Sequence, residues 1–122
     1  MNGLMVFLGG GLGALTRYCL YIILPRASYF PLGTLIANFL GCFIATFVFT
    51  FLIYKTEVNS AYRLLLITGF CGGLSTLSAL SIELTVFIQN QEYLRASLYV
   101  VTSLLICVIS VILGLVTVKK YV

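Results

Sequence analysis

The sequence contains no histidine and no tryptophan, and only three of its 122 residues are acidic. Histidine is the most common general base, and no nucleophile stands beside a base anywhere in the chain. Charged residues make up 8% of the sequence, far fewer than a soluble domain of this size needs on its surface. We therefore expect an integral membrane protein and not an enzyme.

The chain is instead rich in apolar sequence, with 61% hydrophobic residues and a mean hydropathy of +1.16. A helix needs ~20 mostly apolar residues to cross a bilayer, so the length accommodates about four spans. We predict one all-α membrane domain, residues 1–122, with spans at 4–24, 31–54, 62–88 and 94–118. The lysines and arginines lie near span ends, where they act as topology signals and do not indicate nucleic-acid binding.

The four cysteines, Cys19, Cys42, Cys71 and Cys107, all fall inside apolar segments. They are too dispersed along the chain for a metal cluster. We interpret them as small buried hydrophobic residues.

The third predicted span contains a polar, glycine-rich run from Thr68 to Glu83. Loosened backbone and hydroxyl groups are tolerated within a bilayer only where they face protein or a water-filled path. We therefore predict a break in the helix near Gly72 to Ser75. Unwound backbone there would offer carbonyl groups to a cation and amide groups to an anion. Glu83 is the only acid well inside a span, and we interpret it as a structural partner for an arginine or for backbone rather than as a proton carrier.

Small residues recur four positions apart in the first two spans, a spacing that lets helices touch backbone to backbone. In the first span these are Gly9 and Gly13, with Gly10 and Ala14 beside them. The second span has a longer series, formed by Gly33, Ala37, Gly41 and Ala45.

Two polar stripes accompany these packing faces. Thr34, Asn38, Cys42 and Thr46 form one on the second span, while Tyr99, Ser103, Cys107, Ser110 and Gly114 lie near one face of the fourth. The Asn38 amide has two interpretations: an interhelical hydrogen bond, or a donor that replaces water around an anion. Arg17 likewise suits either a snorkelling anchor or an electropositive vestibule that attracts anions. Together the stripes suggest a narrow polar track.

These motifs together resemble those of the fluoride channel family known as Fluc or CrcB, over essentially the whole chain. The resemblance rests on three motifs at matching spacing: Gly9-Gly10 with Gly13-Ala14 and Arg17-Tyr18, Pro31 to Leu35 with Asn38 and Gly41, and Gly69 through Glu83.

The resemblance implies a passive fluoride channel that exports cytoplasmic fluoride across a bacterial plasma membrane. The expected assembly is an antiparallel dimer, with one subunit inverted and a structural Na⁺ on the two-fold axis, held by the backbone carbonyls of Gly72 and Ser75. The vestibule arginine would be Arg17. The expected fluoride pathway comprises Asn38, Thr34, Ser103 and Tyr99, together with Ser78, Thr76, Leu77, Leu80 and Cys107.

The chain departs from the family pattern at two of these positions, because Leu77 and Leu80 stand where the family has phenylalanine. The edge of a phenyl ring can favour an anion, whereas leucine supplies only bulk. Cys42 and Cys107 also stand where serines are expected, which weakens two donors. We therefore hypothesise a heterodimer in which a paralogue supplies the phenylalanines; a homodimer and a non-conducting structural subunit are the alternatives.

A small proton-coupled multidrug exporter would have a similar size and number of spans. That class needs a membrane-embedded carboxylate in the first span, and residues 4–24 contain no acid. The sequence therefore disfavours this alternative.

Overall fold

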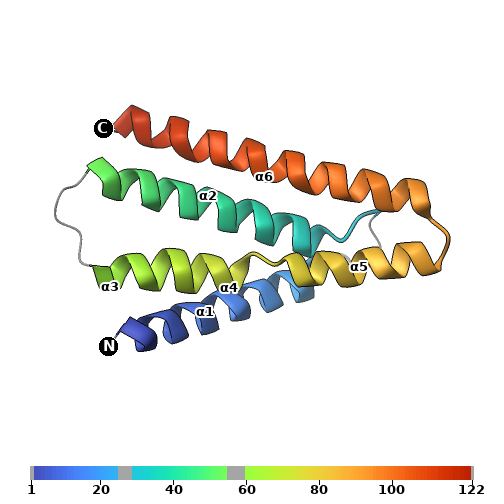
Figure 1. Cartoon of the computed structure of the whole chain (residues 1–122), viewed down its shortest axis with the longest axis horizontal. Helices are drawn as coiled ribbons and strands as arrows, with labels where there is room; N and C mark the ends of the chain where they lie inside the picture. The colour runs from blue at the N-terminus through green and yellow to red at the C-terminus, as the bar shows by residue number, and fades with distance from the viewer. Residues whose placement is uncertain (1, 25–28, 55–59, 122) are drawn as a thin grey trace.

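The protein is described by a computed structural model that covers residues 2–24, 29–54 and 60–121. The regular secondary structure of the described residues is all helical, and Figure 1 shows the helices lying side by side along one long axis. The helices are α1 (Asn2–Ile23), α2 (Leu32–Tyr54), α3 (Ser60–Arg63), the π-helical segment η1 (Leu64–Cys71), α4 (Gly72–Leu74), α5 (Leu77–Gln89) and α6 (Tyr93–Tyr121).

Four helical segments are long and apolar enough to cross a membrane: Asn2–Ile23, Leu32–Tyr54, Ser60–Gln89 and Tyr93–Lys120. These agree with the predicted spans to within two residues at each end. The second predicted span begins at Pro31, but the helix begins at Leu32. The Pro31 carbonyl accepts a hydrogen bond from Leu35 N at 3.3 Å, so the proline stands just before that turn.

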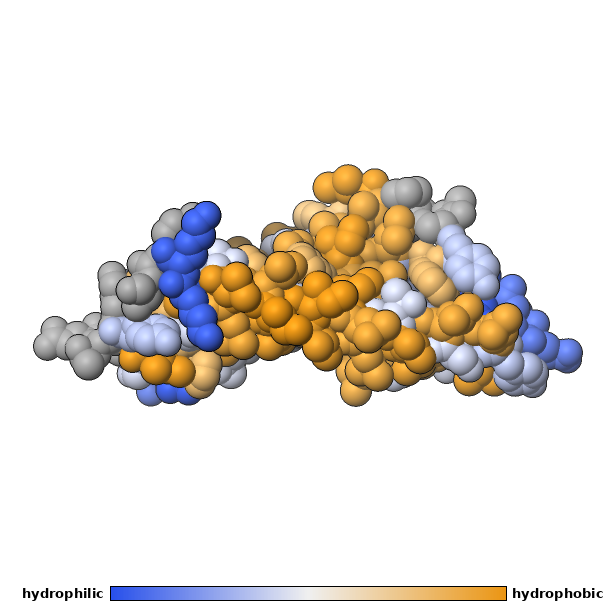
Figure 2. All heavy atoms as spheres, turned by 90° about the horizontal axis from the view of Figure 1, so that it is seen from above, coloured by the Kyte–Doolittle hydropathy of each residue, from blue (hydrophilic) through white to orange (hydrophobic). Residues whose placement is uncertain are grey.

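The outer surface is apolar, the reverse of a soluble protein. Leu77 is 77% exposed and Ile23 76%. Figure 2 shows hydrophobic side chains across the middle of the visible face and hydrophilic ones at its two ends. That distribution matches a bilayer core between two polar interfaces, so the chain is a multi-pass membrane protein.

The spans pack in two close pairs. Helix α2 packs against α6, and α1 packs against η1 and α4, while α2 also touches the third span. In Figure 1 both chain ends lie at the same end of the bundle, as an even number of spans requires.

The predicted small-residue face of α1 is confirmed by its contact with the third span. A Cβ added at Gly9 would overlap Leu65 O, and one at Gly13 would overlap Phe70 O. From the other side, a Cβ at Gly69 would lie 2.9 Å from Gly9 Cα. Backbone therefore meets backbone here, which only glycine permits.

The break in the third span was predicted near Gly72 to Ser75, and the structure confirms it at Ser75 and extends it to Thr76. Gly72 keeps helical dihedral angles (φ −65°, ψ −34°), whereas Ser75 and Thr76 are extended, with ψ of 147° and 122°. Gly69 and Gly73 serve close approach to α1, and the chain unwinds at the two hydroxyl residues that follow Leu74. Upstream, η1 is wound in wide turns, and Gly72 N donates to Ile67 O five residues back.

Substitution of Gly13 with alanine should lower the free energy of unfolding by about 1–3 kcal/mol, because the new methyl group must displace backbone. Gly11 lies on the same helix with nothing within 4 Å of an added Cβ, so Gly11→Ala is the matched control and should leave stability unchanged. Both variants can be titrated with SDS in mixed micelles. Equal stability of the two variants would contradict the packing described here.

Candidate functional site

The polar stripe of α2 contacts the third and fourth spans. Along the helix, Thr34 hydrogen-bonds to α5, and Asn38 hydrogen-bonds to the break between α4 and α5. Thr46 lies where α6 packs closely against α2, since a Cβ at Gly114 would be 3.1 Å from Thr46 Cβ. This single stripe therefore ties the third and fourth spans to the second.

Asn38 binds both backbone groups of Thr76. Its Oδ1 accepts from Thr76 N at 2.7 Å, and its Nδ2 donates to Thr76 O at 3.3 Å. The side-chain amide thus substitutes for a neighbouring peptide group at a residue that has left the helix. Of the two interpretations of Asn38, the interhelical hydrogen bond is present, and Nδ2 carries a second hydrogen besides the one used here.

These bonds take away the usual helical donors of two carbonyl groups. In an α-helix Gly72 O would accept from Thr76 N, but that N–H donates to Asn38. Ser75 O would likewise accept from Ala79 N, which instead donates to Thr76 Oγ1 at 3.2 Å. The two carbonyls predicted to ligate sodium are thus among those that the break releases from helical bonding.

The break lies at the surface of the chain. Gly72 and Ser78 are exposed, Ser75 is half-buried, and the Leu77 side chain points outward. Thr76 is buried, and its hydroxyl lies 3.0 Å from that of Ser78. The released carbonyls and the Ser78 hydroxyl therefore lie at or near the exterior of a single chain.

A second polar cluster surrounds Glu83 on α5. Thr34 Oγ1 donates to Glu83 Oε1 at 2.6 Å, and Tyr99 OH donates to Oε2 at 2.5 Å. Tyr21 OH lies 3.0 Å from Thr34 Oγ1 and must be the donor, because the one hydroxyl hydrogen of Thr34 is already used. Both carboxylate oxygens therefore accept hydrogen bonds from hydroxyl groups.

The predicted partner of Glu83 was wrong. We expected an arginine or backbone, yet the partners are the hydroxyls of Thr34 and Tyr99. Sequence reasoning also missed Tyr21, whose only signal was its position four residues after Arg17 on the same helix.

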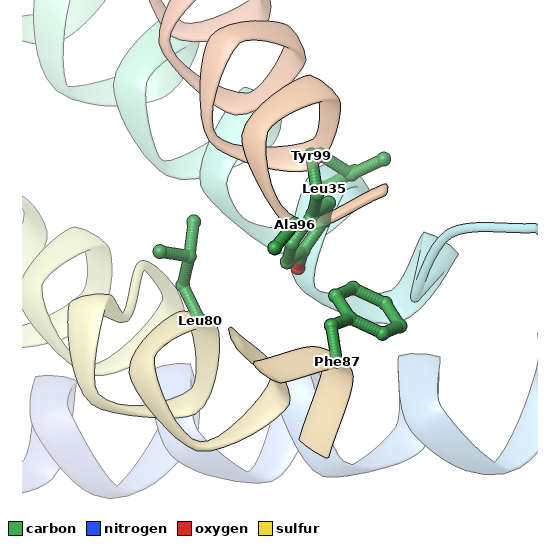
Figure 3. Close-up of a cluster of buried hydrophobic side chains, with 5 residues drawn as sticks. All are labelled: Leu35, Leu80, Phe87, Ala96 and Tyr99. Carbon is green, nitrogen blue, oxygen red and sulfur yellow. The ribbon is translucent and has the colours of Figure 1, made fainter. Parts of the chain in front are cut away.

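Aromatic packing holds Tyr99 in place. Its ring stacks on Phe30 at 5.5 Å and meets the edge of Phe87 at 5.6 Å. Figure 3 shows Tyr99 among the buried side chains of Leu35, Leu80, Phe87 and Ala96. A cavity of about 620 Å³ opens beside Glu83 between α1, α2 and α5, with Tyr18, Tyr21 and Arg95 among its lining residues.

The remaining residues of the predicted track are divided among different contacts. Ser103 donates to Tyr99 O at 2.7 Å and Ser110 to Phe39 O at 2.5 Å, so both hydroxyls bind helix backbone. Cys42 and Cys107 are half-buried and form no disulfide. Leu80 lies in the core and Leu77 outside, so the two leucines do not share a surface within one chain.

Arg17 is partly buried on α1. Within residues 2–24, 29–54 and 60–121 it forms no salt bridge. The same part of the chain contains no group of three or more histidine, cysteine or acidic residues that could hold a metal ion.

Comparison with known proteins places this arrangement in a family. The family described as "CrcB-like protein, Camphor Resistance (CrcB)" matches residues 4–115. The chain belongs to the CrcB-like family. Two relatives bear the name fluoride-specific ion channel FluC. The protein of Pyrococcus abyssi is 43% identical over 96% of this chain and 95% of its own length, and that of a Hydrogenobaculum species is 44% identical over 93% and 94%.

Removing the Tyr99 hydroxyl should destabilise the protein, because the partly buried Glu83 carboxylate loses one of its two donors. We expect Tyr99→Phe to lower the free energy of unfolding by about 1.5–3 kcal/mol, the usual range for hydrogen bonds to charged groups. Tyr93→Phe, on the same helix at a position 63% exposed, should change it by less than about 0.5 kcal/mol. SDS titration measures the free energy of unfolding of both variants. Equal values would contradict the hydrogen bond between Tyr99 and Glu83.

Proposed function

We propose that this protein is a subunit of a fluoride-selective channel that lets cytoplasmic fluoride leave the cell passively. The observation that carries the proposal is the Asn38–Thr76 junction, a helix break lined by hydrogen-bond donors and acceptors inside a membrane span. The names of the relatives from Pyrococcus abyssi and Hydrogenobaculum point the same way.

The chemistry of the junction suits a small, strongly hydrated anion. Fluoride that sheds water needs compact N–H and O–H donors in its place, held loosely enough for the ion to move on. The second hydrogen of Asn38 Nδ2 and the hydroxyls of Thr76 and Ser78 are donors of this kind, and they surround the first residues of α5. The first N–H groups of a helix also lack intrahelical acceptors and carry a partial positive charge.

A structural Na⁺ fits the two released carbonyls. Oxygen ligands suit a hard cation, and Gly72 O and Ser75 O are freed because Thr76 N and Ala79 N donate elsewhere. Carbonyl ligation does not depend on side-chain identity, which accommodates serine at position 75. The ion would supply positive charge that fixes the unwound backbone and offsets the negative ends of the carbonyl dipoles.

One chain provides only half of such a cation site, which favours an antiparallel dimer. Two carbonyls are fewer than the six or so oxygens that hard cations usually gather. Because Gly72 is exposed, a second subunit inserted the opposite way could bring an equivalent pair to the same point. The subunit is a second copy or, as the leucines at 77 and 80 suggest, a paralogue.

Replacing Asn38 with aspartate tests the donor role, because the change keeps the shape, removes the N–H groups and adds a negative charge. Efflux can be measured with a fluoride electrode in proteoliposomes that contain valinomycin. In this assay Asn38→Asp should slow fluoride efflux at least about tenfold, the equivalent of about 1.4 kcal/mol. Asn90→Asp makes the same chemical change at an exposed turn and should leave efflux unchanged.

The same assay separates the possible assemblies. The chain should pass fluoride and not chloride, either alone or when reconstituted with its paralogue. Robust efflux from the chain alone would remove the need for a paralogue. Absence of Asn38-dependent fluoride efflux under both conditions would overturn the proposed function.

Sodium removal tests the cation site without any mutation. Exchanging sodium for N-methylglucamine should lower the free energy of unfolding in detergent by about 2–3 kcal/mol, the value for a ligand present at roughly a hundred times its dissociation constant. An unchanged thermal midpoint would count against a bound cation at Gly72 and Ser75.

A further inference from the structure

The cavity beside Glu83 combines a carboxylate with mostly apolar walls. Its volume of about 620 Å³ lies within the range of roughly 300–1,000 Å³ that is usual for small-molecule sites. Apolar lining comes from Leu24, Leu32 and Ile82, which stand near α1, α2 and α5. A cavity of this kind suits a ligand that has one polar end and an apolar body.

The Glu83 carboxylate has acceptor capacity that the protein does not use. Each of its oxygens accepts one hydroxyl hydrogen, from Thr34 and from Tyr99. An ionised carboxylate offers about four acceptor positions, so about two remain. Among the residues that the structure describes, Glu83 forms no salt bridge. A charge inside a membrane span is costly without a partner, which favours a cationic group beside it.

Arg95 also lines the cavity, but its charge is already balanced by other groups. Its NH1 atom lies 3.0 Å from Glu92 Oε2, and its Nε donates to Tyr29 O at 2.7 Å. The guanidinium carbon lies 4.8 Å from the Tyr29 ring centroid and 4.6 Å from that of Phe87. The negative charge that is left without an ionic partner along the lining is therefore the one on Glu83.

Two tyrosines of α1, Tyr18 and Tyr21, complete the polar side of the cavity. Close packing holds the Tyr21 ring against α2, because a Cβ at Gly33 would overlap it. The Tyr21 hydroxyl lies 3.0 Å from Thr34 Oγ1. Tyrosine rings attract cations through the negative charge on their faces. These rings therefore favour the same sign of ligand charge as Glu83.

We propose that the cavity binds an organic ammonium ion with an apolar body. The ammonium N–H groups donate to the remaining acceptor positions of Glu83, and the body lies against Leu24, Leu32 and Ile82. An inorganic cation does not suit this lining. Hard cations usually gather six or so oxygens, and one carboxylate with apolar neighbours cannot replace that shell of water.

A series of ligands with the same ring and different charge tests the proposal on the unaltered protein. The probes are 1-naphthylmethylammonium, the neutral 1-naphthylmethanol and the anionic 1-naphthoate, measured by fluorescence after equilibrium dialysis. Protein in a neutral maltoside detergent is compared with protein-free micelles. The ammonium ion should bind one per chain and at least about tenfold more tightly than either of the others, because only it donates charged hydrogen bonds to the carboxylate.

Two substitutions locate the binding in the cavity. Glu83→Gln removes the charge, and it should weaken binding of the ammonium probe at least about tenfold and abolish its advantage over the alcohol. Ala79→Leu fills part of the cavity without changing the carboxylate, and it should also weaken binding. Val86→Leu adds bulk at a position on α5 that is 49% exposed and outside the lining, so it should leave the affinity unchanged.

Three results would overturn the proposal: equal affinity for the ammonium ion and the alcohol, an unchanged affinity in Glu83→Gln, or an unchanged affinity in Ala79→Leu. A misfolded Glu83→Gln protein is recognised by its size-exclusion profile. In that case the ligand series and Ala79→Leu decide. The measurement involves no transport, so its outcome is independent of the proposed channel.

Discussion

The two hydrogen bonds between Asn38 and the backbone of Thr76 are the interaction on which the rest of the site depends. Within a bilayer an unpaired peptide group costs several kcal/mol, and no water in the hydrocarbon can relieve it. The side-chain amide satisfies both the N–H and the C=O of one residue, which allows that residue to leave the helix. An alanine at position 38 would leave the N–H and the C=O of Thr76 unpaired, so the break requires the asparagine.

The Asn38–Thr76 hydrogen bonds change the hydrogen bonding of the third span on both sides of Thr76. Upstream, Gly72 loses its usual donor, and downstream the Thr76 hydroxyl caps α5 through Ala79 N. A polar junction is thereby built from one short extended segment, without a loop and without a buried charge at the break itself. Glu83, the one acid inside a span among the described residues, is instead held by the hydroxyls of Thr34 on α2 and Tyr99 on α6.

Much of this fold follows from the sequence, because apolar run length and small-residue spacing are local signals. The spans and the glycine contact of α1 were predicted on that basis, and both are found. The break was confirmed at Ser75 but not at Gly72, since glycine suggested flexibility where Gly69 and Gly73 in fact serve close packing. What releases the backbone is a partner thirty-eight positions away, and such a partner cannot be found from local sequence.

Contacts between spans were the least predictable part of the site. Glu83 was assigned the wrong class of partner because its neighbours, Thr34 and Tyr99, come from other helices whose rotation the sequence leaves open. Thr34 and Tyr99 lie on stripes that were correctly recognised, so the missing information was which stripe faces which helix.

The wide turns of η1 have a consequence for how the chain tolerates changes in length. A π-helical turn holds one residue more than an α-helical turn. Deleting a single residue between Leu64 and Cys71 can therefore be absorbed by tightening that turn, leaving the angular position of Thr76 intact. The α-helical stretch before Asn38 has no wide turn that could tighten. The same deletion there would rotate the Asn38 amide by about 100° away from the break. Alignments of related sequences should therefore have gaps in η1 and not in the first half of α2.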